Sequence, residues 1–189
     1  MTDTSTTTAL PLATGDWKVD PAHSGVHFKI RHLGVSNVRG QFKSFDAGVT
    51  VGDTLDSVAV VATIDLASVD TNQPDRDAHL LSTDFFSADL NPQITFVSTG
   101  VTGTDGDYQL AGDLTINGIT RPVSLPVEFN GAEVHPADGK QHAGFYAATD
   151  INRTDFGIDF NMPLGLDTFA LGKKISIELD LQFVEPSDD

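Results

Sequence analysis

The 189-residue sequence contains no cysteine. Disulfides, thiolate zinc sites, iron–sulfur clusters and a cysteine nucleophile are therefore excluded. No stretch approaches the ~18 consecutive apolar residues that a membrane-spanning helix needs. Basic residues are also scarce, 11 against 27 acidic residues, so the formal net charge is −16 at pH 7. This acidic protein should repel nucleic-acid phosphates, and we expect no nucleic-acid partner.

The N-terminal segment lacks the features of a secretion signal. Residues 1–16 contain no Lys or Arg, and Pro11 interrupts their one apolar run. A signal needs a basic start and an apolar stretch of ~7–15 residues. We therefore expect a cytoplasmic protein with a disordered tail at 1–16, one domain at 17–184 and a second polar tail at 185–189.

Strict alternation of apolar and polar residues is abundant. From Ile175 to Val184 every second residue is apolar, which is typical of a strand with one buried face. Asn117-Gly118 and Asp105-Gly106 are turn pairs that join hairpins. Eight antiparallel strands connected in this way predict an all-β barrel or sandwich. The predicted strands are residues 24–32, 37–51, 56–66, 93–102, 107–117, 119–130, 142–152 and 173–184.

Two segments and two prolines interrupt the alternation. Residues 74–82 begin with a proline followed by acidic residues, a pattern that predicts a short helix. Residues 153–159 predict a turn or a short helix. Pro122 and Pro126 remove backbone donors from the sixth strand, so we expect it to be bulged or partly unpaired.

Four motifs, in a fixed order, carry a resemblance that covers residues 17–184. They are Trp17-x-x-Asp20-x-x-His23-Ser24 with Phe28-x-x-x-His32-Leu33-Gly34; Asp75-Arg76-Asp77-x-His79-Leu80-x-Ser82-x-Asp84-Phe85-Phe86; Tyr108-x-Leu110-x-Gly112-x-Leu114-x-Ile116-x-Gly118; and Ile151-Asn152-Arg153-x-Asp155-Phe156-Gly157.

In these motifs the chain resembles the YceI-like family. The resemblance implies an elongated, eight-stranded antiparallel lipocalin-like barrel, with the short helix over one end. It also implies a long isoprenoid lipid, isoprenoid quinone or other amphipathic chain as the ligand, bound in the lumen. No other cofactor is implied, and the family is not established as catalytic. Pairing of two barrels through an exposed hairpin would make a homodimer.

Strand parity predicts which apolar side chains face the lumen, and the motifs add three phenylalanines. Apolar walls stabilise a buried chain by about 25 cal/mol per Å². Periodicity alone favours a barrel filled by its own side chains, whereas the resemblance implies a hollow one. The predicted lumen residues are Val26, Phe28, Ile30, Phe42, Val60, Ile64, Phe85, Phe86, Ile94, Phe96, Leu110, Leu114, Phe129, Phe145 and Phe156.

Polar side chains within the same motifs are candidates for binding a head group. Apolar pockets use a few such groups to orient a ligand, and arginine suits a phosphate or a quinone carbonyl. Alternatively, Arg76 with Asp77 and Arg153 with Asp155 form internal ion pairs. The candidates are His23, Ser24, His32, Arg76, Asp77, His79, Ser82, Asn152, Arg153 and Asp155.

The histidines do not predict a metal site. On a strand, His23 and His27 share a face while His32 has the opposite parity, so the three do not converge. His135 and His142 flank a loop, where we expect them to be solvated. A zinc or haem site therefore stays an alternative without assigned ligands.

Catalysis is a second alternative. His79 lies close in sequence to Asp75, Asp77 and Asp84, and an acid–base cluster there would allow proton transfer. No nucleophile with a neighbouring base and no phosphate-binding glycine loop is found in the sequence. No catalytic residue is predicted.

We expect Phe96→Asp to abolish ligand uptake while the barrel stays folded, because a carboxylate on the inner wall opposes an apolar chain. Uptake of an isoprenoid lipid would be measured together with circular dichroism. Full occupancy in a folded variant would show that Phe96 does not line the pocket.

Overall fold

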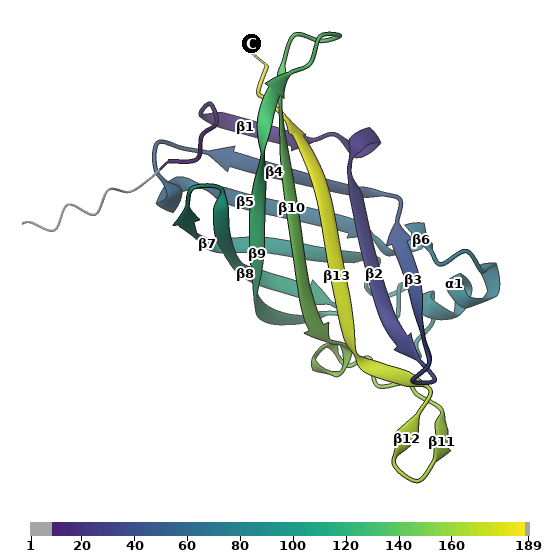
Figure 1. Ribbon diagram of the computed structural model, residues 1–189. Helices are drawn as coiled ribbons and strands as arrows, with labels where there is room; N and C mark the ends of the chain where they lie inside the picture. The colour runs from purple at the N-terminus through teal and green to yellow at the C-terminus, as the bar shows by residue number, and fades with distance from the viewer. Residues whose placement is uncertain (1–8, 188–189) are drawn as a thin grey trace, which may run out of the picture.

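The computed structural model describes residues 9–187 (Figure 1). Eleven of its strands form one antiparallel sheet, and β11 with β12 forms a separate small hairpin. One α-helix, α1 (Pro74–Leu81), and four short 3-10 turns, η1 (Pro21–His23), η2 (Leu55–Ser57), η3 (Leu66–Ser68) and η4 (Arg153–Phe156), complete the described part. The strands are β1 (Gly15–Val19), β2 (Gly25–His32), β3 (Ser36–Phe42), β4 (Phe45–Val51), β5 (Ala59–Asp65), β6 (Val69–Asp70), β7 (Gln93–Thr104), β8 (Asp107–Ile116), β9 (Ile119–Val134), β10 (Gln141–Asn152), β11 (Pro163–Gly165), β12 (Thr168–Phe169) and β13 (Leu171–Val184).

Eight strands close into a barrel, as expected. Their order is β1-β4-β5-β7-β8-β9-β10-β13, and β1 pairs back to β13. Only the end of β13 takes part in this closure, at Phe183 and Val184. From Leu171 to Asp180 the same edge of β13 pairs with β2, which continues the sheet into β3 and β6. The barrel therefore has a closed end, where β1 meets β13, and an open end, where β2, β3 and β6 spread outward.

Strand β1 of the closed ring was not predicted, whereas the predicted β2 lies outside that ring. Seven of the eight expected strands occur to within a few residues. The exception is the strand expected at 37–51, which is broken into β3 and β4 at Lys43 and Ser44. The backbone of Lys43 donates to the Ser68 carbonyl, and the Ser44 carbonyl accepts from Asp65. The chain leaves one part of the sheet and enters another at this point. The inward apolar residues accordingly change from even-numbered positions before the break to odd-numbered positions after it.

The packed core extends further toward the N-terminus than residue 17. Leu10 is buried in the cluster that surrounds Trp17, and β1 begins at Gly15. The Trp17 indole N–H also donates to the Ala13 carbonyl at 2.8 Å. Apolar residues within a threonine-rich stretch are thus drawn into the barrel. The expected disorder of residues 1–8 concerns positions outside the described residues.

The C-terminal boundary also lies later than expected. The Glu185 backbone N–H donates to the Gln141 carbonyl at 2.9 Å, and its side chain accepts from the Gln141 N–H at 2.7 Å. The last residues of the described chain are therefore held against β10.

The proline-containing half of β9 is paired on one side. Pro122 and Pro126 face Asp113 and Gln109 of β8 in an unbroken register. Strand β10, however, pairs with β9 only from Val127 onward. Partial pairing is confirmed, with no bulge against β8, because both rings lie on the exposed face.

Helix α1 also occurs as expected. Proline occupies its start, the Gln73 side chain accepts from the Arg76 N–H, and the helix ends at Leu81. In residues 9–187 we find no helix with the length and apolar character that crossing a bilayer requires.

One glycine in the β7–β8 ladder makes room for an aromatic ring. A Cβ at Gly112 would overlap the ring of Phe96 and lie 2.7 Å from the Val97 carbonyl oxygen. A Cβ at Gly100, in the same ladder, would meet no atom within 4 Å. Comparing alanine at Gly112 with alanine at Gly100 therefore separates the cost of steric overlap from the general effect of replacing a glycine.

We expect Gly112→Ala to lower the free energy of unfolding by about 1–3 kcal/mol, since the ring and backbone must move. Gly100→Ala should leave stability unchanged or raise it by up to ~1 kcal/mol. Thermal unfolding of both variants measures the difference. Equal losses would contradict the steric explanation.

Candidate ligand-binding site

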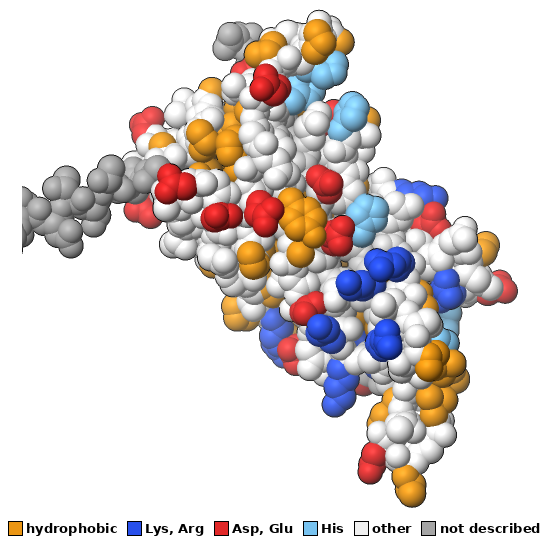
Figure 2. Space-filling view, viewed as in Figure 1, with side chains coloured by type: hydrophobic (Ala, Val, Ile, Leu, Met, Phe, Trp, Pro, Cys, Tyr) orange, Lys and Arg blue, Asp and Glu red, His pale blue; other side chains and the backbone are white. Residues whose placement is uncertain are grey.

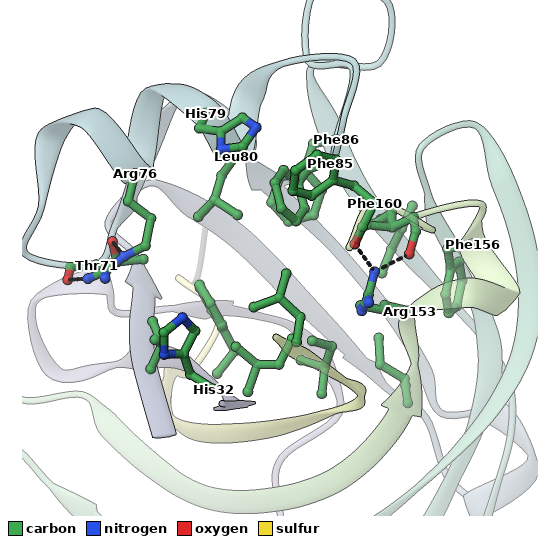
Figure 3. A pocket seen from close by; sticks show the side chains of 18 of the residues that line it. His32, Thr71, Arg76, His79, Leu80, Phe85, Phe86, Arg153, Phe156 and Phe160 are labelled. Atoms are coloured by element: carbon green, nitrogen blue, oxygen red, sulfur yellow. Dashed lines mark hydrogen bonds between the residues drawn. The ribbon is translucent and has the colours of Figure 1, made fainter. Parts of the chain in front are cut away.

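A cavity of about 500 Å³ lies at the open end of the barrel (Figure 3). Its walls come from β2, β3 and β13 on one side and from α1 and the following loop on the other. Nearly all of the lining is apolar. Of the predicted lumen residues, Phe28, Ile30, Phe42, Phe85, Phe86, Ile94 and Phe156 line it.

Two smaller cavities continue along the barrel axis. One of about 160 Å³ shares Phe28, Phe42 and Ile94 with the large cavity, and one of about 90 Å³ shares Val60 and Leu110 with the second. The space therefore narrows from the open end toward the closed end. The remaining predicted lumen residues along this path are Val26, Ile64, Phe96, Leu114 and Phe145.

The closed end is filled by side chains. Trp17 has no exposed surface and packs with Leu10, Tyr108 and Phe183. Phe129, the one predicted lumen residue that lines none of these three cavities, packs against the same cluster. Its ring centroid lies 5.2 Å from that of Phe145. The barrel is thus neither wholly hollow nor wholly filled.

Arg153 places a positive charge in the wall of the large cavity. It is 3% exposed, and its guanidinium donates to three backbone carbonyls, those of Gly172 (2.9 Å), Ile158 (2.6 Å) and Phe160 (2.9 Å). Burial lowers the pKa of Arg153, and the nearby Asp159 acts in the opposite direction. An arginine nevertheless stays charged near neutral pH. The charge therefore reaches the cavity without a carboxylate in direct contact.

The residues around Arg153 hold this turn in place. The Asn152 side chain accepts hydrogen bonds from the backbone and hydroxyl of Thr154 and so begins η4. Gly157 ends the turn with φ +68, a left-handed conformation that favours glycine. Asp155 is exposed. The alternative of an Arg153–Asp155 ion pair is wrong, because carbonyls occupy the guanidinium instead.

Thr71 organises the start of α1. Arg76 donates from Nε to the Thr71 hydroxyl (2.8 Å) and from Nη2 to its carbonyl (2.7 Å). The Asp77 carboxylate accepts from the Thr71 backbone (2.9 Å) and from its hydroxyl (2.5 Å). Arg76 and Asp77 thus share a buried threonine, and the expected ion pair between them is wrong. Arg76 lines the cavity, whereas Asp77 only supports the helix.

His79 connects α1 to the far wall of the cavity. Its ring packs edge-on against Phe85 and Phe160, with centroids 5.0 and 5.2 Å away. Its Nε2 lies 2.7 Å from the Asp84 carboxylate. Of the three aspartates in the acid–base alternative, Asp84 contacts His79, whereas Asp77 binds Thr71 instead. Ser82, another candidate, donates to the His79 carbonyl and ends the helix.

Two head-group candidates lie away from the large cavity. His23 Nδ1 lies 2.7 Å from the Asp20 carboxylate beside η1, and this hydrogen bond lowers the pKa of Asp20 against the raising effect of burial. The Ser24 hydroxyl accepts from the Gln182 backbone at 2.9 Å. Four of the ten candidates line the large cavity, namely His32, Arg76, His79 and Arg153.

Several lining residues were not predicted. Ile175 and Ile177 share the inward parity of β13 and could have been selected from the alternation. Thr71, Phe160 and Met162 belong to irregular segments, for which the sequence carries no periodic signal.

One group of side chains in the described residues could hold a metal ion, at the closed end. Ligand atoms of His135, Asp138 and His142 lie within 4.8 Å of one another. His142 Nε2 is 2.9 Å from Asp138, and its Nδ1 is 2.8 Å from the Gln182 side chain. A backbone hydrogen bond from Lys140, and then the bond to His142, lower the pKa of Asp138. The expected solvation of His142 is wrong, since its side chain is 11% exposed.

Comparison with known protein families gives the same family as the sequence motifs. Residues 17–183 match the family model of the YceI-like domain. The chain belongs to the YceI-like family. UPF0312 proteins of Staphylococcus epidermidis and Staphylococcus aureus are each 42% identical to it over 166 residues, which are 87% of this chain and 94% of the relative.

Solved structures of YceI-like barrels superpose on this one. BcnA of Burkholderia cenocepacia has a TM-score of 0.75 at 26% identity, over 87% of this chain and 98% of its own. The YCEI protein of Campylobacter jejuni has a TM-score of 0.69 at 30% identity, over 84% and 91%. A polyisoprenoid-binding domain from Saccharophagus degradans, at 13% identity and a TM-score of 0.69 over 90% and 98%, shares the fold alone.

We expect Thr71→Val to lower the free energy of unfolding by about 1–3 kcal/mol, because Arg76 and Asp77 both lose a buried partner. Thr120→Val is the control, since its hydroxyl bonds Thr115 at the exposed surface and should change stability by less than about 0.5 kcal/mol. Urea denaturation measures both. Similar losses in the two variants would contradict the role given to Thr71.

Proposed function

We propose that the protein binds a long apolar or amphipathic molecule, an isoprenoid lipid or isoprenoid quinone, inside the barrel. The observation that carries the proposal is the 500 Å³ apolar cavity with the buried Arg153 charge in its wall. The polyisoprenoid-binding domain from Saccharophagus degradans, which shares the fold, adds support. The protein would sequester or carry its ligand.

The apolar part of the ligand would lie in the narrowing series of cavities. Each Å² of apolar surface removed from water contributes about 25 cal/mol. Part of this gain is offset by the loss of freedom of a flexible chain on binding. An isoprenoid is stiffened by its double bonds and methyl branches, so it loses less freedom than a saturated chain of equal length.

The head group would lie at the wide end of the series. Arg153 and Arg76 reach the cavity from opposite walls, and His32 and His79 line it between them (Figure 3). Cationic donors in an apolar site favour electron-rich oxygens, such as those of a phosphate or a quinone carbonyl. Binding of this kind needs no chemical step and assigns no catalytic residue.

Mass spectrometry of an organic extract of the purified native protein tests the proposal. We expect one isoprenoid lipid or quinone in near-stoichiometric amount. An empty extract, together with no uptake when such lipids are supplied, would contradict the proposal.

Substitution of a cavity wall extends this test. Ile175→Trp should lower uptake at least about tenfold, because the larger ring occupies space that the ligand needs. Val97→Trp is the matched control, since Val97 is exposed on the outside of β7. Thermal melting verifies that both variants fold.

A further inference from the structure

The hairpin of β11 and β12 carries unusually exposed apolar side chains. It projects beyond the open end of the barrel (Figure 1). Leu166 at its turn is 97% exposed, and Met162, Leu164 and Phe169 are each more than half exposed. Single exposed apolar residues are ordinary, but a contiguous set on one projection marks an interaction surface.

A second apolar loop lies beside this hairpin. The turn between β2 and β3 exposes Leu33 and Val35, the latter to 77%. The Leu33 backbone N–H donates to the carbonyl of Ala170, directly after β12, at 2.7 Å. The two loops therefore form one surface. We call it the apolar tip, and its residues are Leu33, Val35, Met162, Leu164, Leu166 and Phe169.

The base of the apolar tip is part of the large cavity. Met162 and Ala170, which flank the hairpin, line the cavity, as do His32 before the β2–β3 turn and Leu171 at the start of β13. A surface that covers the apolar tip would thus lie against the wall of the proposed ligand site.

Basic residues gather behind the apolar tip, although the protein as a whole carries a charge of −16. Lys29 faces Arg39 across β2 and β3 and Ser176 on β13, and Arg31 donates to the Gly34 carbonyl within the turn. Lys173 and Lys174 follow on β13. Figure 2 shows most Lys and Arg of this face over the half of the barrel nearer the tip, with acidic groups concentrated over the other half. We call Lys29, Arg31, Arg39, Lys173 and Lys174 the basic band.

Acidic groups also lie at this end of the barrel. Asp150 pairs with Lys174 at 2.9 Å, Asp167 lies in the hairpin turn, and Asp155 and Asp159 lie in η4 and shortly after it. The basic band is therefore a local cluster of positive charge on the strands next to the apolar tip. Such a cluster attracts an anionic surface.

We propose that the apolar tip and the basic band dock the protein on an anionic lipid bilayer. The apolar tip enters the boundary between head groups and acyl chains, and the basic band contacts lipid phosphates. The cavity wall then borders the bilayer, so an apolar ligand can exchange without crossing water. The exchange of a ligand with the bilayer rests on the proposed function, whereas the binding of the apolar tip and the basic band to the bilayer does not.

The charge pattern favours a bilayer over a second copy of the chain. Two barrels joined tip to tip would bring two basic bands close together and repel each other. An anionic bilayer complements both parts of the surface at once.

Co-sedimentation with vesicles tests the docking. We expect the full chain to bind vesicles that contain phosphatidylglycerol at least about tenfold better than vesicles of phosphatidylcholine alone, since several basic residues contribute. Raising the salt from about 0.05 to about 0.5 M should weaken the binding by a similar factor. Absence of binding to either vesicle would overturn the proposal.

Matched variants separate the two parts of the surface. Leu164→Ser with Leu166→Ser, and separately Lys173→Glu with Lys174→Glu, should each reduce binding at least about tenfold. Asp167→Asn should strengthen it. Controls at the closed end are Val134→Ser, at a side chain that is 62% exposed, and Lys18→Glu, and both should bind like the parent protein. Equal loss in the controls would overturn the assignment of the surface.

Ligand uptake from cyclodextrin, measured without vesicles, separates this proposal from the proposed function. Normal uptake without vesicle binding would overturn the docking and leave the proposed function in place. Vesicle binding without uptake would support the docking and contradict the proposed function. A protein that does not bind vesicles and that forms a dimer in solution would overturn the docking in favour of a second copy, provided that Leu164→Ser with Leu166→Ser converts the dimer to a monomer.

Discussion

The edge of β13 pairs with β1 near its last residues and with β2 along its earlier part, and the barrel takes its shape from this division. Where β1 pairs, the ring of eight strands is complete and Trp17 fills it. Where β2 pairs instead, the sheet spreads into β3 and β6, and the interior would face water without a cover. Helix α1, the loop after it and η4 supply that cover, and the large cavity is the space that they enclose.

The cover is held by buried hydrogen bonds as well as by apolar packing. Thr71 joins Arg76 and Asp77 at the start of α1, and Arg153 joins three backbone carbonyls on the opposite side. Backbone carbonyls satisfy a buried arginine without neutralising it, whereas an ion pair would cancel much of its field. Binding of Arg153 by carbonyls therefore leaves a positive potential inside an apolar space, which an ion pair with a carboxylate would not.

Periodicity predicted the barrel because alternate residues of a strand face water and core, and this pattern survives in β7, β8, β10 and β13. The stretch around Lys43 was predicted as one strand because both halves alternate, although the apolar positions change there from even to odd. Four of the polar residues in the shared motifs line the cavity, among them Arg153. The motifs also selected Asn152, which caps the turn η4, and Ser82, which ends helix α1. A motif shows that a residue is needed, but not whether that residue contacts a ligand or the backbone. Phe160 and Met162 lie in an irregular segment whose course depends on the carbonyls that Arg153 binds.

The filled closed end makes the interior a blind tube. A ligand of the proposed kind that entered at the open end would meet Trp17 and its neighbours and go no further, so its tail would arrive first and its head would stay outermost. Release would retrace the same path, with the head leaving first. Loading and unloading would then use the same opening, and whether the ligand is taken up or released would depend on the donor or acceptor at that opening rather than on the barrel.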